Sequence, residues 1–398
     1  MKARLSKKTS HHYFNWLFFL FFLLLPTQFG RHFFLPFSYL SGVRIDYIAP
    51  TIYITDVIGL LLIIFNRQTV FNFFRNKKVL LILGLFLINL FFSLSKFISV
   101  YYYIKILGWL SLFVIFKKNS SYLKKSVFLP FFIAGLLELV LVILQFVNKR
   151  SIQGVFYFLG ERYMTLSTPG IAKATLQGTE LLRPYGTFSH PNSLAGFYLL
   201  LYFFVLTNKS TRNNLLKYPL LFISTVLVFF SFSKIAIVTL LILNTLYLML
   251  KINKCKVCLL AKLTVPIIVG FIFFSAQTDP LSLDKRLALV ANAWQTFLNH
   301  PLFGVGLGSY LVAQNQFPIK YPYFFLQPVH NIFLLFLSET GIIISGSVLW
   351  ILIKKIKKTF LTTNYLLLVA VFITGFFDHY WLTLQQNILL LIYLFSTL

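Results

Sequence analysis

The residues best suited to chemistry in this chain are histidines and arginines in polar segments between long apolar runs. Apart from His11 and His12 near the start, every histidine lies in such a segment. They are His32, His190, His300, His330 and His379. The spacings H-x-x-x-H, H-E-x-x-H and G-x-S-x-G are all missing, so the sequence predicts neither a metal site nor a serine nucleophile. A histidine with no metal to hold is best suited to moving a proton.

His330 is the strongest candidate for proton transfer. It follows Pro328, and the apolar run that starts near residue 331 places it in the first turn of a predicted helix. The partial positive charge at a helix N-terminus disfavours imidazolium, which keeps a neutral base available. The free N–H groups there also favour an anion such as phosphate. The alternative is an interfacial histidine that only caps the helix.

The second set of candidates is cationic. The arginines expected on the outer side of the membrane are Arg31, Arg44, Arg150, Arg162, Arg183 and Arg286. Arginine is suited to bidentate phosphate contacts, although we interpret Arg150 and Arg162 as ordinary solvated charges. Lys234, in Phe-Ser-Lys-Ile-Ala, lies alone between two apolar runs. A binding role and a snorkelling role at the membrane surface are both open for it.

The elements that position these residues are membrane helices. The chain has 398 residues, of which 58% are hydrophobic, and its mean hydropathy is +0.81. Its net charge is +27, but 23 of the 36 Lys and Arg residues and none of the nine acidic residues lie in six short segments between apolar runs. These segments are 2–8, 67–78, 117–125, 209–217, 251–262 and 354–358. This pattern indicates cytoplasmic loops that contact lipid head groups, and it argues against nucleic acid as a partner.

We therefore predict an all-α, polytopic protein with a cytoplasmic N-terminus and about twelve transmembrane helices in one membrane domain over 1–398. The first run is expected to be a retained span, because no small-residue cleavage site follows it. Cys255 and Cys258 are interpreted as bystander thiols. The expected spans are 13–28, 50–66, 79–95, 97–116, 126–147, 193–208, 218–233, 235–250, 263–276, 331–353, 363–377 and 387–398.

Two long outer loops are expected, at about 148–192 and 277–330. The second is predicted to hold an amphipathic helix, capped by Asp284 and ended by Asn299-His300-Pro301, that lies on the membrane or over the helix bundle. Its apolar positions are Leu287, Val290, Ala291, Trp294 and Leu298. The glycines that follow, Gly304, Gly306 and Gly308, indicate a tight turn and a close approach of the backbone to another group.

Two charges are expected within spans. Lys105 and Glu138 lie near the middle of neighbouring antiparallel spans. Because charges in a membrane are costly and tend to pair, we expect an ion pair between them.

Four blocks of the chain resemble the O-antigen ligase and O-antigen polymerase family, in their order and their spacing. They are RPYGTFSHPNSLAGF at 183–197, FSKIAIVTL at 232–240, KRLALVANAWQTFLNHPLFGVGLGSYL at 285–311 and VHNIFLLFLSETGIIISG at 329–346. The resemblance implies a multispan glycosyltransferase in the bacterial cytoplasmic (inner) membrane, with its active site on the extracytoplasmic side. Its expected partners are a polyprenyl-diphosphate-linked glycan donor, such as an undecaprenyl diphosphate, a lipid or glycan acceptor, and membrane lipids.

The resemblance also implies roles for individual residues. His330 matches the proposed general base, and Arg183 and Arg286 match basic residues that bind the diphosphate. Lys234 stands where the family usually has arginine, so this position keeps the positive charge but lacks the planar guanidinium group that binds phosphate in a bidentate manner. Further supporting positions are His190, Asn331, Gly304 and Gly306. No metal and no cofactor are expected, because arginine and lysine can stabilise the leaving diphosphate.

Three functions remain in view. The first is an O-antigen ligase-like inverting transferase that moves a glycan to an acceptor hydroxyl for lipopolysaccharide or another cell-envelope polysaccharide. The second is a repeat-unit polymerase of the same family. The third, a transporter of lipid-linked glycans, would need polar residues along a mid-membrane path, which are sparse here. Aromatic residues that could stack on sugars are Tyr185, Phe188, Tyr310, Tyr321 and Tyr323.

Overall fold

The computed structural model describes most of the chain. The described residues are 15–176, 178–208, 214–251, 264, 267, 270, 280–318, 326–359 and 365–397. Helices predominate among them, and the strands form three short antiparallel pairs, β1 with β4, β2 with β3, and β5 with β6. The predicted helical fold class is therefore confirmed, and the strand pairs are an addition to it.

The longer helices begin with Asn15–Leu24. They continue as α2 Ile54–Phe65, α4 Lys77–Phe91, α5 Lys96–Lys118, α7 Phe128–Asn148, α9 Pro191–Thr207, α10 Asn214–Phe230, α11 Lys234–Lys251, α13 Pro280–Asn299, α15 Ile332–Thr359, α16 Tyr365–Phe377 and α18 Gln385–Thr397. The short helices are α3 Arg67–Phe74, α6 Ser120–Ser126, α8 Val155–Phe158, α14 Tyr310–Gln314 and α17 Tyr380–Thr383, with 3-10 turns η1 Pro36–Ser38 and η2 Asp46–Ile48. The strands are β1 Gly30–His32, β2 Tyr39–Leu40, β3 Val43–Arg44, β4 Thr51–Tyr53, β5 Lys173–Leu176 and β6 Thr179–Leu182.

Three of the described helices are long and apolar enough to cross a membrane, namely α5, α7 and Ile332–Lys354 within α15. Helices α2 and α3 together would make a fourth, but they meet at a bend of 84°, as in a broken span or a re-entrant segment. The remaining apolar helices of the described residues have 10–17 residues. The count of twelve spans stays a prediction, and the expected span 263–276 lies largely outside the described residues.

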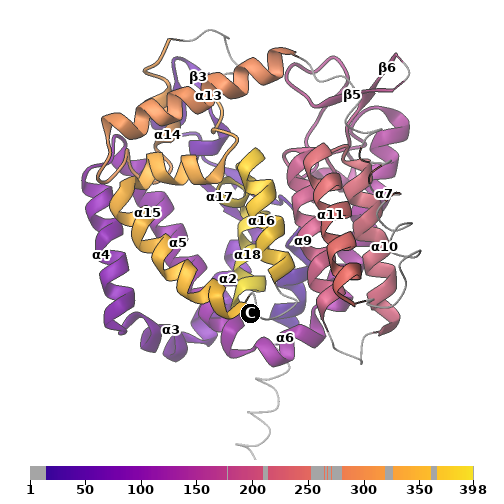
Figure 1. Ribbon diagram of the computed structural model, residues 1–398, viewed down its shortest axis with the longest axis horizontal. Helices are drawn as coiled ribbons and strands as arrows, with labels where there is room; N and C mark the ends of the chain where they lie inside the picture. Colours follow the sequence, from indigo (N-terminus) through magenta and orange to yellow (C-terminus); the bar gives the residue numbers. More distant parts are fainter. Residues whose placement is uncertain are drawn as a thin grey trace, which may run out of the picture.

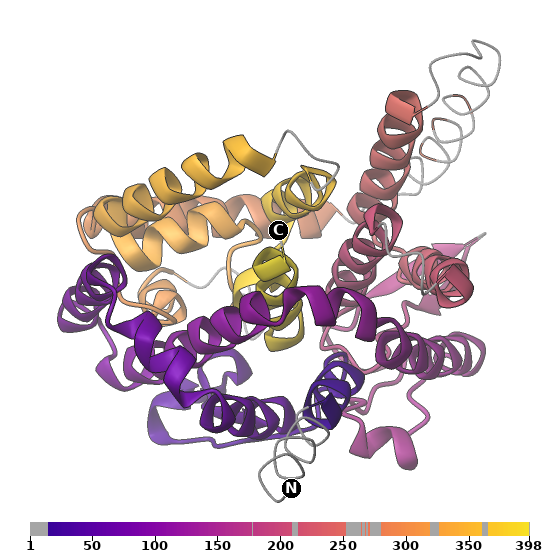
Figure 2. The same cartoon turned by 90° about the horizontal axis from the view of Figure 1, so that it is seen from below.

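The helices stand in two groups on either side of α16, α17 and α18 (Figures 1 and 2). One group contains α4, α5 and α15, and the other contains α7, α9, α10 and α11. The central helices bridge them, because α18 packs against both α5 and α9, and α16 packs against α9, α11 and α15. Helices α3 and α6 lie at one end of the molecule, whereas α13, α14, β5 and β6 lie at the other (Figure 1).

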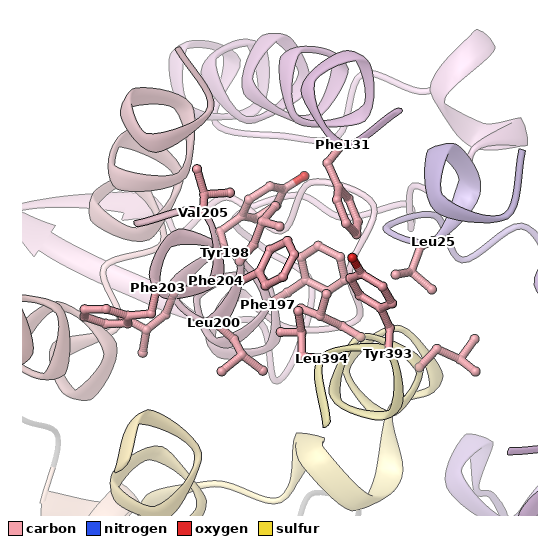
Figure 3. Packing of buried hydrophobic residues seen from close by; sticks show 14 of the residues in the cluster. Leu25, Phe131, Phe197, Tyr198, Leu200, Phe203, Phe204, Val205, Tyr393 and Leu394 are labelled. Atoms are coloured by element: carbon pink, nitrogen blue, oxygen red, sulfur yellow. The ribbon is translucent and has the colours of Figure 1, made fainter. Parts of the chain in front are cut away.

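The main core surrounds α9. This helix is apolar on all sides, so neighbours can cover it completely, and the side chains from Leu194 to Leu201 are fully buried. Phe131 of α7 and Tyr393 of α18 pack against it from two directions (Figure 3). Gly196 allows the ring of Tyr380 to lie against α9, because a Cβ there would collide with that ring. The core thus fixes the start of α17 relative to α9.

The predicted ion pair between Lys105 and Glu138 is wrong. Nζ of Lys105 lies 2.5 Å from Oδ2 of Asp56 and donates to Oε1 of Gln385 at 2.8 Å. Gln385 in turn donates to Oδ1 of Asp56 at 2.9 Å. Lys105 therefore ties α5 to α2 and α18. The prediction considered only adjacent spans, whereas the bundle places α18, from the end of the chain, beside α5.

A helix, α13, is present where the amphipathic helix of the second outer loop was predicted, with two differences in its start and in its apolar face. It begins at Pro280, so Asp284 lies inside the helix and does not cap it. It ends at Asn299, as predicted. All five predicted apolar positions are exposed, namely Leu287, Val290, Ala291, Trp294 and Leu298. The residues that face the protein are Leu289 and Ala293, so α13 has apolar side chains on both faces.

Candidate active site

His330 lies immediately before α15. That helix begins at Ile332, and Asn331 caps it, because its Oδ1 accepts hydrogen bonds from the backbone N–H groups of Phe333 and Leu334 at 3.0 and 2.9 Å. His330 is therefore outside the first turn where it was predicted. It remains beside the helix N-terminus, and only 16% of its side chain is exposed.

The carboxylate of Asp378 faces His330. Oδ1 of Asp378 is 3.5 Å from Nδ1 of His330, which is longer than a normal hydrogen bond. Within the described residues, this buried nitrogen has no other polar neighbour at hydrogen-bond distance. A carboxylate beside Nδ1 favours the tautomer with its proton on that atom, so Nε2 is left as the proton acceptor.

Two further donors hold Asp378 in place. Nδ2 of Asn192 donates to its Oδ2 at 2.7 Å, and the backbone N–H of His379 donates to its Oδ1 at 2.8 Å. Burial by itself raises the pKa of Asp378, but interactions with His330, His379 and His190 outweigh it and hold the pKa well below its usual range. Asp378 is therefore ionised at neutral pH, and its charge can stabilise an imidazolium at His330.

Arg183 supports this carboxylate through Asn192. Its Nη2 donates to Oδ1 of Asn192 at 2.6 Å, and its Nε donates to the carbonyl oxygen of Ser231 at 2.9 Å. The side chains thus form a continuous series from Arg183 through Asn192 and Asp378 to His330. Arg183 orients the amide that orients the carboxylate, a positioning role that the sequence alone did not suggest.

Two neutral histidines stand beside this series. The ring centroid of His379 is 5.1 Å from that of His330, and His190 lies at the start of α9. Burial lowers the pKa of both His379 and His190 to about 3, and the charge of Arg183 adds to the effect at His190. Both rings are therefore uncharged at neutral pH, which leaves the charge of Asp378 available to His330.

A cavity of about 1020 Å³ opens in front of these residues. Its walls come from distant parts of the chain: the segment 28–47, the loop 157–171, the turn before α9, and the segments just before α15 and α17, which carry His330 and His379. The polar lining residues include His32, Arg44, Tyr47, Glu161, Arg162, Tyr185, His190, His330, Asp378 and His379. A cavity of this size is at the upper end of the range for small-molecule sites, so it can admit several sugar units.

The three predicted cations are electrostatically coupled to one another and to the site. Arg183, Lys234 and Arg286 are not among the lining residues in the described part of the chain. Arg183 is nevertheless within electrostatic range of Lys234 and Arg286, and Arg286 acts on His379 as well. The structure therefore brings these cations and His330 into one region, although their contact with a diphosphate stays a prediction.

The turn that carries Arg183 is fastened to α7. Oε1 of Gln145 accepts from the backbone N–H groups of Tyr185 and Gly186, both at 2.9 Å. The carboxylate of Glu138 accepts from the N–H of Thr187 at 3.1 Å. Gly186 has φ of 60°, and a Cβ there would collide with that carboxylate, so the position requires glycine. Glu138 therefore anchors the turn.

Gly304 and Gly306 serve a different contact. Both have positive φ, 68° and 96°. A Cβ on Gly304 would strike the backbone of Glu339, and one on Gly306 would strike the hydroxyl of Ser93. The N–H of Gly306 donates to the carbonyl oxygen of Glu339 at 3.0 Å. These glycines thus let their loop dock on α15 next to its kink at Gly341, and they support the site only through the placement of that helix.

The aromatic lining differs in part from the prediction. Of the predicted residues, Tyr185 lines the cavity, Phe188 and Tyr310 are buried in packing, and Tyr321 and Tyr323 lie outside the described residues. The exposed aromatic residues of the lining are Phe29, Tyr157, Phe158 and Tyr163, with 45, 61, 64 and 73% of their surface accessible. Rings that stay exposed beside a polar cavity offer stacking surfaces for sugars.

His330, Asp378 and His379 also have the geometry of a possible metal site. One ligand atom from each lies within 4.8 Å of the others, and imidazole with carboxylate is a common ligand combination for transition metals. Short-motif reasoning could not detect this group, because its members come from two separate segments. Metal-independent chemistry therefore stays a prediction that needs its own test.

The comparison with known families covers part of the site just described. Residues 219–344 match the family model of the O-antigen ligase. The matched segment contains Lys234, Arg286 and His330 and covers all or most of three of the four sequence blocks, whereas the block 183–197 lies outside it. The match supports the resemblance to the family. The family's members are glycan-transferring membrane enzymes, and the findings support that general kind of function for this chain. Searches of curated proteins and of solved structures gave no match.

Sequence reasoning did not assign Asn192, Asp378 and His379, which lie outside the matched segment, to the site. Asn192 stands in the same block as Arg183, and a polar residue so close to an expected helix start was the available signal. Asp378-His379 is an acidic and basic pair between two apolar runs, 363–377 and 387–398. Since intramembrane and interfacial charges are rare and usually have a function, this pair could have been singled out.

Proposed function

We propose that this protein is an O-antigen ligase-like inverting glycosyltransferase at the outer face of the cytoplasmic membrane. It moves a glycan from a polyprenyl-diphosphate carrier to an acceptor hydroxyl. The observation that carries the proposal is the series Arg183–Asn192–Asp378–His330 at the wall of a large cavity. A histidine backed by a carboxylate is a general base, and the matched family transfers glycans.

In the proposed reaction, Nε2 of His330 takes the proton of the acceptor hydroxyl. The acceptor oxygen forms a bond to the anomeric carbon as the bond from that carbon to the diphosphate oxygen breaks. The electron pair of the broken bond leaves with the diphosphate, and a single displacement inverts the anomeric centre. Asp378 stabilises the imidazolium of His330, much as a buried carboxylate does beside the histidine of a catalytic triad.

The leaving diphosphate gains negative charge, and cations provide the stabilisation that this charge needs. Arg183 is within electrostatic range of Asp378, Arg286 and Lys234, so the three cations form one group of positive charges. They do not line the cavity in the described part of the chain, so we expect them to act on the diphosphate mainly through the electrostatic potential. Arg183 also holds the side chain of Asn192, which in turn orients the carboxylate of Asp378.

The decisive experiment replaces His330→Ala in cells whose glycans are resolved on a gel. Loss of attachment, with long chains remaining on the lipid carrier, is expected for a ligase. Single repeat units on the acceptor would instead indicate the repeat-unit polymerase, and a normally attached glycan of normal length would contradict the assignment of His330. The matched control is His300→Ala, in the same O-antigen ligase domain but outside the cavity lining, which should behave as wild type.

A further inference from the structure

A second group of cations lies in the cavity itself. Arg44, at the end of β3, has its Nε 3.4 Å from Oδ1 of Asp46, and Nη2 of Arg162 lies 2.6 Å from Oδ2 of the same carboxylate. Both arginines line the cavity. They come from two different outer segments, which this shared carboxylate holds together.

The group has an excess of positive charge. One carboxylate faces two guanidinium groups, and burial lowers the pKa of the neighbouring His32, which keeps that ring neutral at pH 7. Each guanidinium carries five N–H donors, and one nitrogen of each contacts Asp46. The side chains of Arg44 and Arg162 remain 58 and 47% exposed. Asp46 thus orients the two guanidinium groups, and their remaining N–H donors can reach a ligand.

The group lies close to the proposed base. Tyr47 follows Asp46 directly, and its ring centroid is 5.5 Å from that of His379. Tyr47 is within electrostatic range of both Arg162 and Asp378. Tyr185, on the other wall, is within range of both Arg162 and Arg183. An anion held by Arg44 and Arg162 would therefore lie in the same cavity as the imidazole of His330.

We propose that Arg44 and Arg162, oriented by Asp46, form an anion subsite for a phosphate or diphosphate group on one of the two substrates. The proposal rests on the proposed transferase function and adds to it a binding contact outside the matched O-antigen ligase domain. Positively charged residues on the outer side run against the orientation rule for membrane proteins, and planar guanidinium pairs suit phosphate oxygens. The bound anion can be the carrier diphosphate of the donor or a phosphate group on the acceptor.

The test measures KM for donor and acceptor separately with Arg162→Gln and Arg44→Gln in reconstituted vesicles. Loss of a charge-assisted contact is expected to raise KM about 10- to 100-fold for one substrate only. A raised donor KM identifies the carrier diphosphate, and a raised acceptor KM identifies an anionic acceptor. Unchanged KM values for both substrates would overturn the proposal.

A binding measurement separates this proposal from the role of His330. Inorganic diphosphate is titrated into full-length His330→Ala protein, alone and with Arg162→Gln added. Binding that weakens at least about 10-fold with Arg162→Gln supports the subsite even if His330 proves not to be the base. Equal binding by both proteins contradicts it. The control is Arg150→Gln, an exposed arginine of the same outer loop that does not line the cavity.

Discussion

Nδ1 of His330 lies 3.5 Å from Oδ1 of Asp378, at the meeting point of two segments that precede different helices. The buried carboxylate of Asp378 therefore faces Nδ1 of the imidazole, and the other ring nitrogen, Nε2, is the one that would accept a proton. The pair is slightly too long for a regular hydrogen bond, but the two atoms are close enough for the charge of the carboxylate to act on the imidazole. Activity should therefore depend on the charge of Asp378 as well as on His330.

Asp378→Asn should lower kcat at least about 100-fold with little change in KM, because an amide cannot stabilise the imidazolium and can favour the wrong tautomer. Initial rates with a lipid-linked donor measure the effect. A purely structural role for Asp378 would lower thermal stability in proportion and leave the pH–rate profile of the remaining activity unchanged. Retained kcat in a folded variant would remove Asp378 from the mechanism.

Arg183 and Asn192 should behave as one unit. Arg183→Lys keeps the charge but loses the fork that spans Asn192 and the carbonyl oxygen of Ser231. We expect Arg183→Lys and Asn192→Ala each to lower kcat about 10-fold or more, and the double variant to be little worse than either. Full additivity in this double-mutant cycle would mean that Arg183 acts on the substrate independently of Asn192.

Acid should destabilise the fold through His379. Burial lowers its pKa in the folded protein to about 3, whereas an unfolded histidine titrates near 6.5. Between these values the unfolded state binds more protons, so stability falls as pH drops below about 6.5. This histidine alone should remove about 2 kcal/mol between pH 7 and pH 5. Thermal unfolding at several pH values measures it.

His379→Gln should flatten that pH dependence, whatever its effect on stability at pH 7. The comparison to make is the slope of the unfolding temperature against pH in the two proteins. Equal slopes would show that His379 is already protonated or solvent-exposed in the folded state. His300→Gln is a suitable control, because His300 lies outside the group around Asp378.

Metal chelation tests the predicted metal independence. If His330 acts as a free base, prolonged EDTA treatment should leave kcat unchanged within about twofold, and added Zn²⁺ should inhibit by occupying His330, Asp378 and His379. Activity assays with metal analysis of the purified protein decide the point. Loss of activity on chelation and recovery with a divalent metal would replace the free-base mechanism by a metal-assisted one.

The sequence by itself was sufficient for the helical class of the protein and for several candidate residues of the site. Apolar runs identified the helices because every backbone polar group in a membrane must be satisfied within the segment, and Lys234, Arg286 and His330 stood out as polar residues in the blocks that the family match supports. Helix α13 was predicted because apolar residues recurred at helical spacing.

Only the tertiary structure decided which of these residues act together. Asp378, Asn192 and Arg162 come from segments far apart in the chain, and their local patterns do not specify which partners they meet. The wrong partner predicted for Lys105 has the same origin. Helix α18 packs beside α5, so Gln385 of α18 contacts both Lys105 and Asp56. Helix periodicity is a local property, whereas the meeting of outer loops depends on how whole helices pack, so the cavity and its second cation group became visible only in the folded chain.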